Sequence, residues 1–321
     1  MSVDTSVLAA AARAAGHAPS IHNTQPWRWR VGRTLDLYAD RGRQLAVTDP
    51  EGRLLTLSCG AALHHAVVAL AAEGWRADVD RLPDAAHPDL LARIAAAEPV
   101  PVQPAAVRLL QTMSLRHTDR RPVTDREVDP AALAKVELAV HAAGAALHRL
   151  DREHVIDLAG AAAHAQAVES LDPGWLAEME YWAGGARVEG TGVPDDVIPA
   201  RAPETTVPGR DFGHPGSLAI SAGHDRAALY AILYGDDDSP VSWLRAGEAL
   251  SAGWLEATEL GLSVLPLSAA VEVARTRHVL RRLLGGVGYP YLVLRLGAAD
   301  PDHAGPPHTP RLPAEQVVEV I

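Results

Sequence analysis

A group of short polar side chains lies between two regular segments near the start of the chain. The run Ala18-Pro19-Ser20-Ile21-His22-Asn23-Thr24-Gln25-Pro26-Trp27 follows an alanine-rich helical pattern at 4–16 and precedes a strand-like alternation at 27–31. Proline, serine, asparagine and glutamine in such a connection predict a rigid turn with exposed backbone amides and short side chains that can hold a planar polar ligand. The alternative is a purely structural turn whose two tryptophans anchor the core.

The elements around this turn follow from apolar periodicity and from residues that begin and end helices. Ser58 is expected to cap a helix from about Cys59 to Glu73, and Asp129-Pro130 to begin another that reaches Ala143. A further long helix is expected at 242–260. Strands are expected at 27–31, 34–40, 75–82, 145–150, 227–234, 262–267 and 290–296.

Two stretches rich in proline or glycine interrupt this pattern. Residues 97–105 contain three prolines and are interpreted as a linker between an N-terminal half, 1–104, and a C-terminal half, 105–321. Residues 183–216 are dominated by glycine and proline and show no periodic face. Such a long irregular stretch is expected to be either a mobile surface loop or a lid over a site.

The two halves share a short internal repeat. Gly60-Ala61-Ala62-Leu63 is followed, eleven residues after the leucine, by Gly74, and Gly247-Glu248-Ala249-Leu250 is followed at the same spacing by Gly261. Each copy lies in an expected helix that leads into a strand. Small residues at these positions would allow two helices to approach closely.

Composition excludes several classes of protein. With 321 residues, 48% of them hydrophobic, the chain can bury a sizeable core, and a net charge of −11 disfavours nucleic-acid binding through a basic face. We expect no membrane span, because in our interpretation no apolar run reaches the roughly 20 residues that a spanning helix needs. The first residues lack the basic region of a signal peptide. The single cysteine, Cys59, excludes a disulfide framework and indicates a reducing, cytoplasmic location.

Other motifs give no support to alternative chemistry. The histidines, including His64-His65, lack metal-ligand spacing, and Asp236-Asp237-Asp238 lacks the ligand order of a calcium loop. No strand is followed by GxGxxG and no GxSxG is present, which argues against a Rossmann nicotinamide domain and against a serine hydrolase. No metal is therefore expected.

The run PSIHNTQPWRW, together with Ser58-Cys59-Gly60-Ala61-Ala62-Leu63, resembles the FMN-dependent nitroreductase superfamily and in particular its Acg-like branch. In that branch two nitroreductase-like units are fused in one chain. The resemblance covers most of the chain and is weakest over 145–215. It implies an α+β, nitroreductase-like fold arranged as a monomeric, intramolecular pseudo-dimer, with FMN bound non-covalently.

The resemblance also assigns residues to the phosphate of FMN. Arg116-His117-Thr118-Asp119-Arg120 matches the family's Arg-x-Ser/Thr-x-Arg motif, and Arg311 in Thr309-Pro310-Arg311-Leu312-Pro313 resembles its closing phosphate contact. A phosphate dianion needs charge-assisted donors, which arginine and threonine supply. Taken alone, the arginines could instead form a solvated cluster neutralised by Asp119 and Asp125.

These motifs are divided between the halves. The Pro-Ser turn occurs only in the first half and the phosphate motif only in the second, so one complete flavin site and one degenerate site are expected. Leu265-Pro266-Leu267-Ser268-Ala269 resembles the segment that passes the redox edge of the flavin, where a backbone N–H faces N5. The cofactor residues implied are Pro19, Ser20, Ile21, His22, Asn23, Arg116, Thr118, Arg120, Pro266, Leu267, Ser268, Ala269 and Arg311.

The function implied is that of an oxidoreductase in which NAD(P)H reduces FMN, and FMN then reduces a small electron acceptor, a nitro compound or a quinone. The chemistry belongs to the flavin, so no catalytic acid or base is assigned, although His22 is expected to line the substrate pocket. The alternative is a flavin-sequestering or storage protein in which 183–216 closes over FMN and blocks reduction. A structural protein that keeps the fold without the flavin is the third reading.

Overall fold

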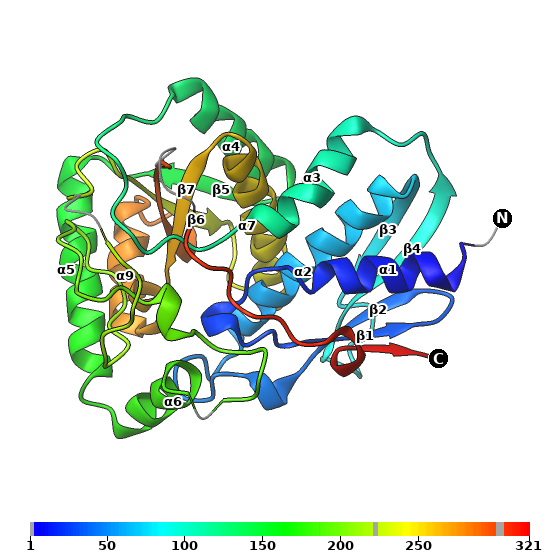
Figure 1. The fold of residues 1–321 in the computed structure, drawn as a ribbon, viewed down its shortest axis with the longest axis horizontal. Coiled ribbons are helices and arrows are strands. Elements are labelled where there is room, and N and C mark those ends of the chain that lie inside the picture. Colours follow the sequence, from blue (N-terminus) through cyan, green and yellow to red (C-terminus); the bar gives the residue numbers. More distant parts are fainter. Residues whose placement is uncertain (1–2, 186, 221–223, 300–304) are drawn as a thin grey trace.

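The computed structural model describes residues 3–185, 187–220, 224–299 and 305–321. The described chain forms two antiparallel-rich sheets separated by helices (Figure 1). The helices are α1 Thr5–Ala15, α2 Arg53–Ala72, α3 Pro104–Leu115, α4 Pro130–Ala142, α5 Arg152–Glu169, α6 Pro173–Ala183, α7 Pro240–Glu259, α8 Ala269–Glu272 and α9 Ala274–Leu283. The described fold is therefore α+β, as the sequence indicates.

The first sheet has the strand order β3-β4-β2-β1-β9. Its strands are β1 Trp27–Val31, β2 Leu35–Ala39, β3 Trp75–Arg81, β4 Leu90–Pro99 and β9 Val318–Val320. Neighbouring strands are antiparallel except β9, which runs parallel to β1 with Trp29 opposite Val318. The C-terminal end of the chain thus returns from the second sheet and completes the first (Figure 1).

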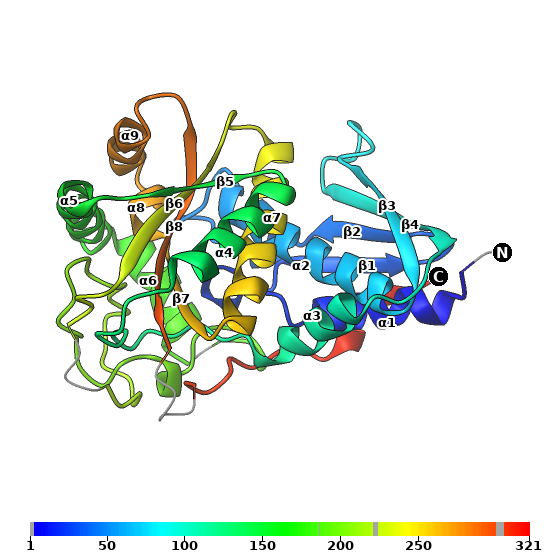
Figure 2. The same ribbon diagram turned by 90° about the horizontal axis from the view of Figure 1, so that it is seen from above.

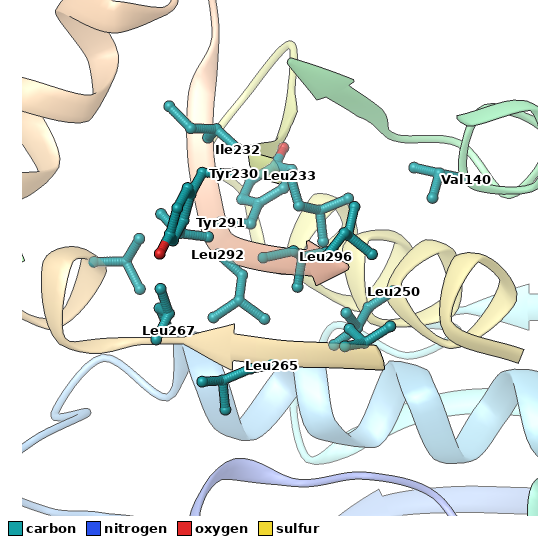
Figure 3. Packing of buried hydrophobic residues seen from close by; sticks show 14 of the residues in the cluster. Val140, Tyr230, Ile232, Leu233, Leu250, Leu265, Leu267, Tyr291, Leu292 and Leu296 are labelled. Carbon is teal, nitrogen blue, oxygen red and sulfur yellow. The ribbon is translucent and has the colours of Figure 1, made fainter. Parts of the chain in front are cut away.

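The second sheet is fully antiparallel, in the order β5-β6-β8-β7. Its strands are β5 Ala146–Arg149, β6 Leu229–Gly235, β7 Leu262–Leu267 and β8 Tyr289–Ala298. Apolar side chains of β6, β7 and β8 pack with Leu250 of α7 and Val140 of α4 in one core cluster (Figure 3). Strand β8 is buried along nearly its whole length, and its sequence is correspondingly apolar apart from Arg295.

Helices α2 and α7 lie side by side between the two sheets (Figure 2). Each is 20 residues long, and each carries its repeat glycine seven positions after its first residue, at Gly60 and Gly247. A Cβ on Gly60 would lie 2.0 Å from the carbonyl oxygen of Leu244, and one on Gly247 would lie 1.9 Å from that of Leu57. The expected close approach of two helices at the repeat is therefore confirmed.

The structure corrects two local expectations. Helix α2 begins at Arg53, not at Cys59, because Gly52 occupies the cap position and Ser58 bonds back to the carbonyl of Leu54 from inside the helix. Strand β4 extends to Pro99 at the end of the sheet, so only 100–103 connect it to α3. Pro99 is tolerated because it lies in the last position of the strand.

The length and apolar composition of α2 would suffice for a membrane span, contrary to the sequence interpretation that no run qualifies. Within its apolar window, 83% of the residues are buried inside the protein. Leu54 and Leu57 of this helix pack into the core of the second sheet, while Leu244 of α7 packs into that of the first. This burial on all sides explains why the helix lacks a polar face.

Candidate functional site

The Pro-Ser turn is a short 3-10 turn, Ile21–Asn23, wedged between α1 and β1. His22, Asn23 and Gln25 all have positive φ values, of 43°, 54° and 49°. Residues other than glycine rarely adopt this backbone conformation, so the surrounding contacts must impose it. The hydroxyl of Ser20 accepts the N–H of Gln25 at 2.9 Å, and that of Ser58 accepts the N–H of Ile21 at 3.1 Å.

The polar groups of this turn are directed largely at the protein itself. The side-chain amide of Asn23 donates to the carbonyls of Gly192 at 3.1 Å and Pro310 at 2.9 Å, and Gln25 donates to Gly190 at 2.7 Å. The backbone N–H groups of residues 21, 23, 24 and 25 are also bonded internally. The expectation of a turn with freely exposed amides is therefore wrong for these positions, because the turn holds the chain segments at 190–192 and 310–312.

Both tryptophans that follow the turn are buried, as its structural interpretation requires. The burial of the tryptophans does not exclude a ligand-binding role for the turn, because the turn also borders a cavity of about 580 Å³. This volume is in the range of small-molecule and cofactor sites. The cavity is lined by every residue that the sequence assigns to the cofactor: Pro19, Ser20, Ile21, His22, Asn23, Arg116, Thr118, Arg120, Pro266, Leu267, Ser268, Ala269 and Arg311.

Arg116 and Arg311 bring uncompensated positive charge to this cavity. Arg116 is 4% exposed, its guanidinium lies 4.4 Å from the ring of Trp254, and its Nε and Nη1 have no hydrogen-bond partner in the described chain. Burial, and secondarily the charge of Arg311, lowers the pKa of Arg116 to about 9. Burial lowers the pKa of Arg311 to about 10.

Arg311 is fixed by neutral groups only. Its Nη1 donates to Oδ1 of Asn23 at 3.0 Å and to the hydroxyl of Thr309 at 2.6 Å, while its Nε has no partner among the described residues. Within the same residues no carboxylate forms an ion pair with Arg116, Arg120 or Arg311, and Asp119 pairs instead with Arg121 at 2.8 Å. The alternative of a solvated cluster neutralised by Asp119 is therefore wrong.

Arg120 faces a different part of the cavity from Arg116. Its Nη1 donates to the carbonyl of Val197 at 3.3 Å, and its guanidinium lies 5.4 Å from the ring of Phe212. Burial lowers its pKa to about 10, with Asp119 opposing and Arg210 adding to the effect. The structure thus separates the motif into a buried arginine near Arg311 and a second one against 193–212.

A buried ion pair that the sequence interpretation missed holds the loop carrying this motif. Arg295 on β8 bonds the carboxylate of Asp225 at 2.8 Å and the carbonyl of Asp119 at 2.9 Å. Asp225 in turn accepts the N–H of Val123 at 2.7 Å. Neither residue has a local sequence signal, since Asp225 lies in a loop and Arg295 interrupts an apolar strand.

The segment after β7 forms another wall of the cavity. Strand β7 ends at Leu267, and Ser268 stands at the start of the short helix α8. The hydroxyl of Ser268 accepts from Nη2 of Arg210 at 3.3 Å, and its carbonyl accepts the N–H of Val271. Pro266, Leu267, Ser268 and Ala269 thereby face the cavity from the second sheet, while the Pro-Ser turn faces it from the first half.

Residues from 193 to 215 form the remaining wall. Phe212, the only phenylalanine of the chain, lies with its ring centroid 6.1 Å from that of His22 in an edge-to-face arrangement. With Val193, Val197 and Ile198 it forms a small core against Trp175 and Met179 of α6. The described residues of 183–216 therefore pack against α6 and border the cavity, while the role of the segment as a lid stays a prediction.

His22 is the titratable group of the turn. Its side chain is almost fully buried and its Nε2 has no partner within the described residues. Burial, with added repulsion from Arg210 and Arg120, lowers the pKa of His22 well below its ordinary value. The imidazole is therefore neutral at physiological pH and cannot serve as a cationic donor there.

Comparisons with known proteins find relatives that match nearly the whole chain. No family model matches the chain. The Mycobacterium tuberculosis H37Rv protein named "Putative NAD(P)H nitroreductase Rv3131" is 42% identical over 311 residues, which cover 94% of this chain and 88% of that protein. "Putative NAD(P)H nitroreductase acg" of the same strain is 32% identical, covering 99% of this chain and 97% of that protein.

Among solved structures, the FMN and NADPH-dependent nitroreductase NfnB from "sphigopyxis sp. strain HMH" matches 66% of this chain and 97% of its own, with 16% identity and a TM-score of 0.41. The fold is α+β, and its cavity is lined by residues of both halves, Arg116 and Arg311 among them. The similarity to Rv3131 and Acg over nearly the full length then identifies the family: the chain belongs to the nitroreductases, in the group of these two proteins.

Proposed function

We propose that the cavity binds FMN and that the protein is an NAD(P)H-dependent oxidoreductase of the nitroreductase type. The observation that carries this proposal is the pair of a buried Arg116 and a half-buried Arg311 beside the cavity, neither with a carboxylate partner in the described chain. An uncompensated buried charge is costly, and an anionic group with several acceptor oxygens relieves that cost. The phosphate of FMN is such a group.

The remaining lining residues fit the rest of the cofactor. Thr118 lines the cavity and supplies a hydroxyl group. Arg120 lines it too and supplies N–H groups that can donate hydrogen bonds to oxygen or nitrogen atoms at the edge of a ring. The Pro-Ser turn and the 266–269 segment face the cavity from opposite halves, with apolar and short side chains suited to a planar ring. When bound, FMN supplies the hydride-accepting and hydride-donating chemistry.

The chain's own residues position the cofactor and exclude water. The clamp of Asn23 and Gln25 fixes the segments at 190–192 and 310–312, and therefore also fixes Arg311. No side chain is assigned as acid or base, which accords with the neutral His22. The names of Rv3131 and Acg support NAD(P)H as donor and a nitro compound as acceptor, with a quinone as a further acceptor.

We further infer that residues 1–104 and 105–321 are duplicated units forming an intramolecular pseudo-dimer with one functional site. The matched helices α2 and α7, each followed by a positive-φ glycine and a strand, support this inference. Glu248, next to the repeat glycine of α7, forms a bidentate pair with Arg81 at 2.7 Å for both bonds. This ion pair engages Arg81, so that this arginine is not available to a second phosphate.

A flavin-sequestering function is the second candidate, and the position of Phe212 favours it. Its ring lies between His22 of the turn and Arg120, at a wall that a nicotinamide would have to approach. A segment closed in this way would retain FMN while slowing hydride transfer. The two candidates share the cofactor and differ in the rate of reduction.

Binding is tested by titrating the protein with FMN and with riboflavin, which lacks the phosphate. FMN is expected to bind about 100-fold more tightly or better, from two charge-assisted contacts of ~1.5–3 kcal/mol each. Equal affinities would contradict a phosphate site at Arg116 and Arg311. Anaerobic addition of NADPH to the FMN-loaded protein then separates a reductase, which loses its flavin absorbance rapidly, from a store, which does not.

A further inference from the structure

Arg210 attaches the segment 183–216 to the second half of the protein through a buried charge cluster. Its side chain is 9% exposed and donates from Nη1 to Oε2 of Glu169 at 3.3 Å. Glu169 is the last residue of α5. Nη2 of Arg210 donates to Oε1 of Glu272, the last residue of α8. The guanidinium also lies 5.7 Å from the ring of Trp175 on α6.

The cluster contains two carboxyl groups for one guanidinium. The side chains of Glu169 and Glu272 are 5% and 2% exposed, and they lie within hydrogen-bonding reach of one another. Each keeps one buried oxygen, Oε1 of Glu169 and Oε2 of Glu272, that receives no donor from the described residues. A single proton held by the pair would supply the missing donor and make the cluster neutral.

The charged groups around the cluster do not supply another countercharge. Asp49, in the loop before α2, is close enough to Glu272 for their charges to interact, and it is also acidic. Arg120 and His22 are close enough to Arg210 for their charges to interact with its guanidinium. Burial, and the neighbouring Glu272, raise the pKa of Glu169 to about 8, against the opposing charge of Arg210.

We propose that Arg210, Glu169 and Glu272 form a proton-dependent latch that holds 183–216 closed over the cavity while the glutamate pair keeps one proton. Loss of that proton leaves a net negative charge in a buried site, which favours release of Arg210 and opening of the segment. The role of this latch in cofactor access rests on the proposed function. The latch itself rests on the cluster alone.

The sign of the pH dependence follows from the two states. The latch requires that opening exposes Glu169 to water, which would give it an ordinary pKa of about 4.3, whereas in the closed state its pKa is raised to about 8. The closed state therefore binds more protons between these values, and it loses stability as pH rises through this window. The open population is expected to increase by up to about tenfold per pH unit and to level off above about pH 8.

Trypsin measures this opening directly in the full-length protein, because Arg210 is buried in the closed state whereas Arg201 of the same segment is exposed. First-cut fragments 1–210 and 1–201 are quantified by intact mass between pH 6 and pH 9. Their ratio cancels the pH dependence of trypsin itself. We expect the ratio to rise at least tenfold between pH 6 and pH 8 and then to reach a plateau.

Glu169→Gln should flatten this profile, because the glutamine carries no ionisable proton. Glu272→Gln provides an independent variant with the same expectation, since one carboxyl then remains beside Arg210. Glu153→Gln, on the exposed first turn of α5, is the matched control and should keep the parent profile. A flat parent profile, or a Glu169→Gln profile as steep as that of the parent, would overturn the latch.

The FMN content of each sample, read from its absorbance, keeps this result separate from the proposed function. Failure of FMN to bind would overturn the cofactor assignment and leave the cleavage ratio as the measure of the latch. A flat ratio in protein that binds FMN would overturn the latch and leave the assignment of the cavity intact.

Discussion

Arg116 is the residue at which stability and cofactor binding are expected to move in opposite directions. Its charged group is buried, stacks on Trp254 and has no carboxylate partner in the described chain. Replacement by methionine keeps a flexible chain of similar length and removes the charge. In the FMN-free protein, Arg116→Met should therefore raise the free energy of unfolding, while FMN affinity should fall.

The magnitude follows from the cost of the buried charge. Burial lowers the pKa of Arg116 to about 9, roughly 3.5 pH units below its ordinary value, which at about 1.36 kcal/mol per unit corresponds to about 5 kcal/mol. At pH 7 the arginine is charged in the folded and the unfolded chain, so the whole cost applies, and it is relieved only as pH rises above about 9. The interaction with Trp254 returns about 2 kcal/mol, which leaves an expected gain of about 2–3 kcal/mol.

Calorimetry of the FMN-free protein should show Tm higher by about 4 °C, given about 2 cal/mol/K of unfolding entropy per residue. Isothermal titration should show FMN affinity reduced by about 10- to 100-fold, the worth of one charge-assisted contact. Arg116→Lys keeps the charge and should give no gain in stability. A methionine variant that is less stable than the parent, or that binds FMN as tightly, would refute the reasoning.

Four other outcomes are expected. Gly247→Ala should cost about 3 kcal/mol of stability in denaturant unfolding, because its Cβ would meet a carbonyl at 1.9 Å, whereas Gly160→Ala, with nothing nearby, should gain up to about 1 kcal/mol; equal effects would contradict the helix contact. Arg311→Ala should weaken FMN binding at least about tenfold by titration, and unchanged affinity would place this arginine outside the site. FMN stoichiometry should be about one per chain; a value near two would exclude the single site. Phe212→Ala should accelerate reduction of bound FMN in stopped flow, and an unchanged rate would contradict obstruction by this ring.

Local sequence patterns were sufficient for most of the elements, and the resemblance to the nitroreductase superfamily supplied the residues that line the cavity. The Pro-Ser turn, the arginine motif and the 266–269 segment are short motifs whose residue types are dictated by their backbone or charge, and the structure brings them to one place. The repeat glycines likewise identified the contact of α2 and α7, because only a missing side chain permits that approach.

The remaining features depend on contacts distant in sequence. Strand β9 pairs with β1 across nearly the whole chain, and no local pattern specifies that partner. The same holds for Asp225 and Arg295, whose ion pair supports the arginine loop, and for Arg210, whose carboxylate partners come from two separate helices. Glycine and proline in 183–216 predicted irregular backbone, but could not show that the segment shares a core with α6.

The central claim, an FMN-dependent oxidoreductase built around this cavity, is tested most directly by anaerobic titration of the FMN-loaded protein with NADPH. The account predicts loss of the oxidised flavin absorbance with about one equivalent of NADPH per FMN, because hydride transfer moves two electrons. The absorbance should return on addition of a nitro compound or a quinone. Bound FMN that keeps its full absorbance at excess NADPH would contradict the claim.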